Sequence, residues 1–156
     1  MNNFSKLLIS TVGCLAIGFL GSIATTPAIP TWYSTLNKPS FNPPNWIFAP
    51  VWTTLYVLMG ISLYLIWKKG FKNKENKMAI QVFLIQLGLN LIWSFLFFGF
   101  QNPLLAFFEI IILWGAILLT IIKFYKISKI SAYLLLPYIL WVSFASFLNL
   151  FIVILN

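Results

Sequence analysis

Histidine, arginine and aspartate are absent from this sequence, and cysteine occurs once, at Cys14. Without histidine there is no histidine general base, no Ser-His-Asp triad and no histidine-ligated haem iron. Without aspartate there is no pair of catalytic aspartates, and a single cysteine forms neither an internal disulfide nor a cysteine-based metal site. We therefore expect no catalytic residue, no metal site and no required cofactor.

Charge of either sign is also scarce. Charged residues make up 8% of the 156 residues and hydrophobic residues 61%, whereas an average soluble protein is about 25% charged. A soluble domain of this size needs far more polar surface than this chain can supply. The composition therefore predicts an integral membrane protein.

Five stretches are long and apolar enough to cross the hydrocarbon core as helices, which takes about 20 residues each. They cover about residues 6–26, 46–67, 78–100, 104–124 and 131–155. Each is continuously apolar rather than alternating, which disfavours a membrane β-barrel. We predict an all-α integral membrane protein of one domain, residues 1–156. It would be a five-transmembrane-helix bundle with a long proline- and aromatic-rich loop between the first two helices.

The lysines indicate how the bundle is oriented. With five spans, nine of the ten fall on the side of the N-terminus: Lys6, Lys68, Lys69, Lys72, Lys74, Lys77, Lys123, Lys126 and Lys129. Lys38 falls on the other side. The positive-inside rule then predicts a multi-pass cell-membrane protein with its N-terminus in the cytoplasm and its C-terminus outside. Nucleic-acid binding is the disfavoured alternative, because the lysines lie at span ends without a basic domain.

The first span has a second interpretation, as a cleaved signal peptide. It has a lysine before an apolar run and small residues near Ala24 and Ala28. The apolar run is longer than a usual signal core. We therefore expect it to remain as a membrane span.

Six of the eight prolines lie within residues 27–50, together with five aromatic residues. Proline fixes φ and removes a backbone donor, so this segment should be stiff and partly non-helical. Its aromatic side chains could form an interfacial belt or a lid over a site inside the bundle. A long, proline-dense loop among short ones favours the lid, which we place at residues 27–45.

Polar side chains within the spans indicate either a site or helix packing. Gln86, Asn90 and Ser94 share one face of the third span, since they stand at i, i+4 and i+8. Glu109 is the one acidic residue inside a span, where ionisable groups face the bundle interior or a wet cavity. Buried amides often serve only as hydrogen-bonding glue between helices. Both interpretations stay open for these residues.

Aromatic residues supply candidate walls for a pocket. Trp52 and Tyr56 share a face of the second span, and Trp141, Ala145 and Asn149 share a face of the fifth. Small-molecule sites combine apolar walls with a few polar anchors. We expect Trp52 and Trp141 to be the main walls, because indole rings stack well on a flat, conjugated ligand.

Residues 32–44 read WYSTLNKPSFNPP, and the pattern continues through residues 46–52 as WIFAPVW. This pattern resembles that of the tryptophan-rich sensory protein and translocator protein (TspO/MBR) family, and the chain is similar to a bacterial-type member. Three further segments agree, in order along the chain: residues 18–22, residues 86–90 and residues 136–149. The resemblance implies a five-helix bundle, often a homodimer. It also implies a pocket near one membrane face, beneath the loop that joins the first two helices.

The same resemblance implies a membrane receptor that binds porphyrins, such as protoporphyrin IX and haem, and isoquinoline carboxamide or benzodiazepine-type ligands. The residues that it places at the ligand are Trp52, Asn90, Trp141, Ala145, Trp32, Tyr33, Ser22, Ala24, Tyr56 and Phe144. Glu109, Gln86 and Asn149 are candidates for polar or structural roles.

Two positions depart from the animal members of that family. Residues 147–155 lack the tyrosine and the basic residue of the proposed cholesterol motif, so cholesterol is not an expected native ligand. A fourth-helix pocket tryptophan of animal members is replaced near Leu105. The affinity for synthetic ligands is therefore expected to differ.

Three functions remain open from the sequence. The first is sensing, sequestration or transport of tetrapyrroles by a binding protein. The second is light-dependent degradation of a bound porphyrin, because tryptophan is oxidisable and would lie next to the ligand. The third is secondary transport, with Glu109 as the one titratable group inside the membrane, although no inverted repeat is visible.

Overall fold

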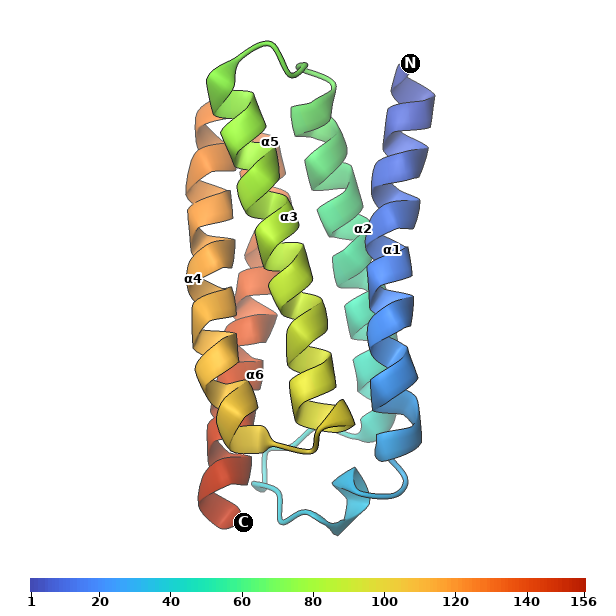
Figure 1. The fold of residues 1–156 in the computed structure, drawn as a ribbon, viewed down its shortest axis with the longest axis vertical. Coiled ribbons are helices and arrows are strands. Elements are labelled where there is room, and N and C mark those ends of the chain that lie inside the picture. The colour runs from blue at the N-terminus through green and yellow to red at the C-terminus, as the bar shows by residue number, and fades with distance from the viewer.

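The computed structural model describes all residues, 1–156, and they form an all-helical bundle (Figure 1). The long helices are α1 (Asn3–Ala28), α2 (Phe48–Trp67), α3 (Lys74–Ser94), α4 (Pro103–Ile127) and α6 (Leu136–Leu155), with the short α5 (Lys129–Leu134) before α6. Two 3-10 turns, η1 (Tyr33–Thr35) and η2 (Asn45–Ile47), precede α2, and one π-helical turn, η3 (Phe95–Gly99), follows α3.

Five helical segments are long and apolar enough to cross a membrane, which confirms the predicted five-span, all-α bundle. The helices run alongside one another, and the N-terminus and C-terminus lie at opposite ends (Figure 1). The connection between α1 and α2, residues 29–47, lies across the end where the C-terminus is found. We refer to it as the cap segment.

Side-chain caps mark where several helices begin. Asn2 accepts a hydrogen bond from the Ser5 amide at the start of α1, and Asn102 accepts one from the Leu105 amide at the start of α4. Pro103 follows as the first residue of α4, where its missing N–H costs nothing. These polar residues satisfy amides that have no partner within the helix, and so they set the ends of the apolar segments.

The fifth span is broken rather than continuous. α5 ends at Leu134 and α6 begins at Leu136. Pro137 has no N–H to donate to the carbonyl of Tyr133, and its ring disfavours helical geometry just before it. The sequence predicts one helix over residues 131–155, and this break is the main departure of the structure from that prediction.

Glycines allow α1 and α2 to approach closely. A Cβ at Gly60 would lie 2.5 Å from the Thr11 Cα, and one at Gly18 would lie 2.6 Å from the Tyr56 ring. Close contact of this kind replaces the hydrophobic effect as a source of helix association in lipid. The contact between these helices therefore depends on the absence of side chains at both glycines.

Candidate functional site

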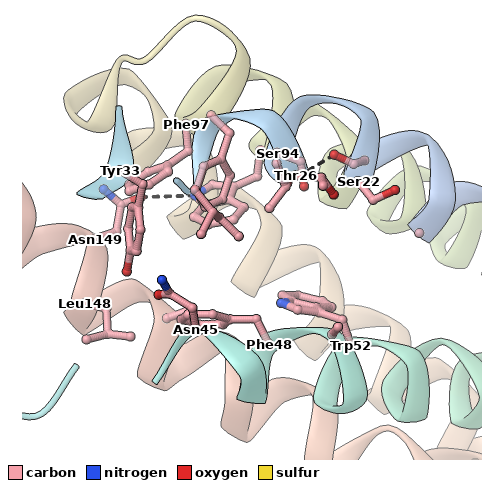
Figure 2. Close-up of a pocket in the computed structure, with 18 of the residues that line it drawn as sticks. Ser22, Thr26, Tyr33, Asn45, Phe48, Trp52, Ser94, Phe97, Leu148 and Asn149 are labelled. Atoms are coloured by element: carbon pink, nitrogen blue, oxygen red, sulfur yellow. Dashed lines mark hydrogen bonds between the residues drawn. The ribbon is translucent and has the colours of Figure 1, made fainter. Parts of the chain in front are cut away.

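A cavity lies inside the bundle at the end covered by the cap segment (Figure 2). The cavity volume is about 210 Å³, and about 1090 Å³ of space is free of protein atoms when its open mouth is included. The lining residues are Gly18, Gly21, Ser22, Thr25, Thr26, Ile29, Tyr33, Asn45, Phe48, Ala49, Trp52, Tyr56, Trp93, Ser94, Phe97, Phe98, Trp141, Ala145, Leu148, Asn149 and Ile152. All of the long helices except α4 contribute to it.

The helical period explains how these residues reach one space. Ala49, Trp52 and Tyr56 lie on one face of α2, and Trp141 and Ala145 lie on one face of α6. In Figure 2, Phe48 and Trp52 extend from α2 into the cavity, with Tyr33 and Phe97 across from them. The cavity is thus enclosed by aromatic rings that come from separate parts of the chain.

The rings also pack against one another. Trp52 lies 5.7 Å from the Tyr56 ring and 6.4 Å from the Tyr138 ring, and Trp93 stacks on Phe97 at 5.1 Å. Offset and edge-on aromatic pairs of this kind are favourable beyond their burial. The walls are therefore held in place before a ligand enters.

Tyr33 covers the cavity from the cap segment. Its ring is buried against Phe97 and Phe98, and its hydroxyl donates to Asn42 Oδ1 at 3.0 Å. Burial raises the pKa of the Tyr33 phenol, and the hydrogen bond with Asn42 offsets part of that rise. Lys38 Nζ donates to the Tyr33 carbonyl at 2.8 Å and lies 4.7 Å from the centre of its ring. Tyr33 is therefore a fixed, uncharged cover.

Asn149 supplies a polar group in the wall. Trp93 Nε1 donates to Asn149 Oδ1 at 3.0 Å, and Asn149 Nδ2 donates to the Pro103 carbonyl at 2.8 Å. Figure 2 shows the first of these bonds at the edge of the cavity. Asn149 thus joins α6 to α3 and to the start of α4, and it lines the cavity as well.

Asn90 lies beneath the cavity and not in its lining. It is buried, it accepts a hydrogen bond from the Tyr56 hydroxyl, and its Nδ2 donates to the Tyr138 hydroxyl at 2.9 Å. The Tyr138 hydroxyl in turn donates to Gln86 Oε1 at 2.7 Å. This buried polar chain reaches the cavity only through Tyr56.

The structure brings seven of the sequence-predicted residues into the lining: Ser22, Tyr33, Trp52, Tyr56, Trp141, Ala145 and Asn149. Others lie one layer behind it. Trp32 packs edge-on against Phe97 at 5.6 Å, and Phe144 packs against Trp141 at 5.5 Å. Ala24 is close to Gly99, since a Cβ at Gly99 would lie 3.7 Å from the Ala24 Cβ.

Glu109 is outside the cavity. Both of its carboxyl oxygens are buried without a hydrogen-bonding partner. Its neighbours along the inner face of α4 belong to two apolar clusters, Ala106 to the cluster with Tyr33 and Phe97, and Ile110 to the main core. Glu109 therefore stands between two apolar layers and does not contact the space where a ligand would lie.

Several lining residues are not among those predicted from the sequence, chiefly Trp93, Phe97, Phe98 and Phe48. Trp93 lies three residues after Asn90, and Phe97 lies three residues after Ser94, so both follow the face that the polar residues define. Phe97 and Phe98 belong to the π-helical turn η3, a type of turn that is frequent at functional sites. Helical spacing was therefore the sequence feature that could have identified Trp93 and Phe97. Both are apolar, and so they were less conspicuous than the amides.

The chemical character of the site is that of a binding pocket. No group of three or more His, Cys, Asp or Glu side chains comes together anywhere in the chain. The lining contains hydroxyls, two amides and the indole N–H groups, but no ionisable acid or lysine. Such a site can hold an apolar ligand by ring contacts and a few hydrogen bonds.

Comparison with known proteins agrees with the resemblance noted in the sequence. Residues 10–155 match the TspO/MBR family. The chain is 51% identical to the tryptophan-rich protein TspO of Archaeoglobus fulgidus, with 99% of each chain aligned. It is 37% identical to the translocator protein of Homo sapiens, over 91% of this chain and 82% of that protein. It is 31% identical to the tryptophan-rich sensory protein of Cereibacter sphaeroides, over 83% and 81% respectively. The chain therefore belongs to the TspO/MBR family of membrane proteins.

Proposed function

We propose that the cavity binds porphyrins, such as protoporphyrin IX and haem, and that the protein acts in tetrapyrrole sensing, sequestration or transport. The observation that carries this proposal is the set of aromatic rings around one open space, with Trp52, Trp93 and Trp141 among them. A planar conjugated macrocycle matches such walls, because it stacks on indole and phenyl rings over a large area. Isoquinoline carboxamide and benzodiazepine-type ligands fit the same description on a smaller scale.

Tryptophan fluorescence tests this proposal directly. Protoporphyrin IX should quench the emission of the purified protein, and W52F/W141F should weaken its affinity on the order of tenfold, because two stacked contacts are reduced. W67F/W114F is the matched control, since it also replaces two indoles but neither lines the cavity. Equal affinity in the wild type and W52F/W141F would show that porphyrin binds elsewhere.

A second function, light-dependent degradation of the bound porphyrin, is favoured by the same walls. Three oxidisable indoles face the space that a photosensitising ring would occupy. Illumination of the complex in the presence of oxygen should bleach the porphyrin absorbance faster than in matched detergent. The rate should fall in W52F/W141F at equal porphyrin occupancy. Equal bleaching rates with and without protein would exclude this activity.

The buried Glu109 gives little support to the third function, secondary transport, because it has no contact with the cavity. Uptake of porphyrin into proteoliposomes by the wild type and by E109Q separates transport from binding. A proton-coupled transporter would lose uptake in E109Q, whereas a binding protein would show no net uptake in either case.

We also propose an orientation and an assembly. The nine lysines at the end opposite the cap segment favour that end in the cytoplasm, with the cavity toward the outside. The family resemblance favours a homodimer. The orientation is tested by introducing Ser40→Cys in a Cys14→Ser background and labelling that cysteine from outside intact cells. The homodimer is tested by determining the mass of the protein in detergent.

A further inference from the structure

The connections from α2 to α3 and from α4 to α5 lie at the end of the bundle opposite the cap segment (Figure 1), and most of the lysines lie in or next to them. Nine of the ten lysines are at this end, and Glu75 is the one acid near them. The positive-inside rule accounts for the side of the membrane on which they lie. It does not account for how they are grouped within that side.

The turn after α2 contacts the end of α4 through a lysine. Lys69, just after α2, donates from Nζ to the carbonyl of Ile127 at the end of α4, at 2.9 Å. This bond brings Lys68 and Lys69 to the junction of α4 and α5, which carries Lys126 and Lys129. All four lysines are exposed. We refer to these four as the basic corner.

Aromatic rings hold two of these ammonium groups. Lys68 Nζ lies 5.6 Å from the centre of the Tyr64 ring, and Lys129 Nζ lies 5.6 Å from the centre of the Tyr125 ring. Tyrosine is typical of the level at which lipid headgroups meet hydrocarbon, and cation–π contact restrains an ammonium group above such a ring. The ammonium groups of Lys68 and Lys129 are thus restrained beside these rings.

No acidic side chain belongs to the basic corner, because Glu109 is buried within α4 and Glu75 lies in the first turn of α3. The like charges of the basic corner repel one another, and a bound anion would reduce that repulsion. Ile122 and Ile130 are exposed beside the corner, on the helices that carry Lys126 and Lys129. A ligand that suits this place combines a negative charge with hydrocarbon chains.

We propose that the basic corner binds the phosphate headgroup of an acidic phospholipid, whose acyl chains lie along the apolar surface beside it. Basic clusters at the ends of membrane helices attract anionic lipids with about 1 kcal/mol for each lysine near the surface. The proposal does not rest on the porphyrin function, because the corner and the cavity are at opposite ends of the bundle.

The test compares two triple variants of the full chain in detergent. K69Q/K126Q/K129Q removes three charges from the corner, and K6Q/K74Q/K77Q removes three from the same end outside it. Native mass spectrometry with dioleoyl phosphatidylglycerol and dioleoyl phosphatidylcholine gives the affinity for each lipid. The corner variant should lose affinity for phosphatidylglycerol on the order of a hundredfold at low salt, from about fivefold per lysine. The control variant should lose much less.

Three results would overturn the proposal. Equal losses in both variants would mean a general effect of surface charge, and equal affinity for phosphatidylcholine would mean that the headgroup charge is not recognised. Displacement of phosphatidylglycerol by millimolar inorganic phosphate would mean a site for the free anion. Thermal unfolding in the same detergent confirms that each variant is folded. If the triple variant fails that check, K129R should keep the affinity for phosphatidylglycerol and K129Q should lower it.

Discussion

The Tyr56 hydroxyl donates a hydrogen bond to Asn90 Oδ1, and this contact connects a wall of the cavity to a polar chain buried beneath it. The chain continues through Tyr138 to Gln86, so it ties together α2, α3 and α6. Trp52 packs against both tyrosine rings. Asn90 therefore influences the cavity without facing it, because it positions the rings that support Trp52.

Replacement of Asn90 by leucine should impair both stability and binding. N90L keeps the branched side-chain shape but leaves the buried Tyr56 hydroxyl without an acceptor, which costs about 1–3 kcal/mol of unfolding free energy. Loss of that contact also lets the tyrosine rings that pack against Trp52 move, so porphyrin affinity should fall severalfold. Thermal unfolding in detergent and fluorescence quenching by protoporphyrin IX measure the two effects.

S62A is the control for that variant. Ser62 makes a buried hydrogen bond between helices, to the Ser131 carbonyl, but it lies outside the cavity. It should lower stability and leave porphyrin affinity unchanged. If N90L and S62A altered porphyrin affinity equally, Asn90 would have no positioning role and would act only as a packing residue.

A methyl group should have opposite effects at two glycines. At Gly60 it would meet the Thr11 backbone, 2.5 Å from Cα, whereas at Gly88 nothing lies within 4 Å. G60A should therefore separate α1 from α2 and lower stability by about 1–3 kcal/mol, as overpacking does. G88A should be neutral or raise stability by up to about 1 kcal/mol, since alanine favours helix. Thermal unfolding of both variants in one detergent measures the two effects. Equal effects of G60A and G88A on stability would contradict the close approach of α1 and α2.

Much of the site could be predicted from helical spacing. Trp52 with Tyr56, and Trp141 with Ala145, lie at i and i+4, and each pair faces the same space in the structure. Spacing gives the face of a helix but not the depth at which a cavity ends. Asn90 and Ser94 share a face, yet Ser94 lines the cavity and Asn90 lies below it.

Composition and apolar length were enough to predict the membrane segments of the fold. Apolar length located five membrane segments, because each crossing of the bilayer needs one. The break between Leu134 and Leu136 was missed, although Pro137 lies within that apolar run. A proline can either kink or end a helix, and the choice depends on how the neighbouring helices pack. That information is not present in a single segment of sequence.

The cap segment should loosen when its link to the C-terminal end of α6 is cut. Asn156 Nδ2 donates to the Asn37 carbonyl at 2.9 Å, and Asn156 Oδ1 accepts from the Asn37 amide at 3.0 Å. N156A removes both bonds, so amide exchange near Asn37 should become faster and porphyrin should dissociate severalfold faster. Hydrogen–deuterium exchange and stopped-flow fluorescence measure this. N2A removes another exposed asparagine, at the opposite end of the bundle, and should change neither rate. An unchanged dissociation rate in N156A would show that the cap segment does not control ligand release.

Iron should add little to the binding of a porphyrin. The lining contains no histidine, cysteine or methionine, and its two tyrosine hydroxyls donate to Asn42 and Asn90. Because burial raises the pKa of Tyr33, that phenol stays protonated and is a poor ligand for ferric iron. Haem and protoporphyrin IX should therefore bind with affinities within about fivefold of each other, a difference of about 1 kcal/mol. Fluorescence quenching by both compounds measures the ratio. A much tighter haem complex, weakened in Y33F, would instead identify Tyr33 as an axial ligand.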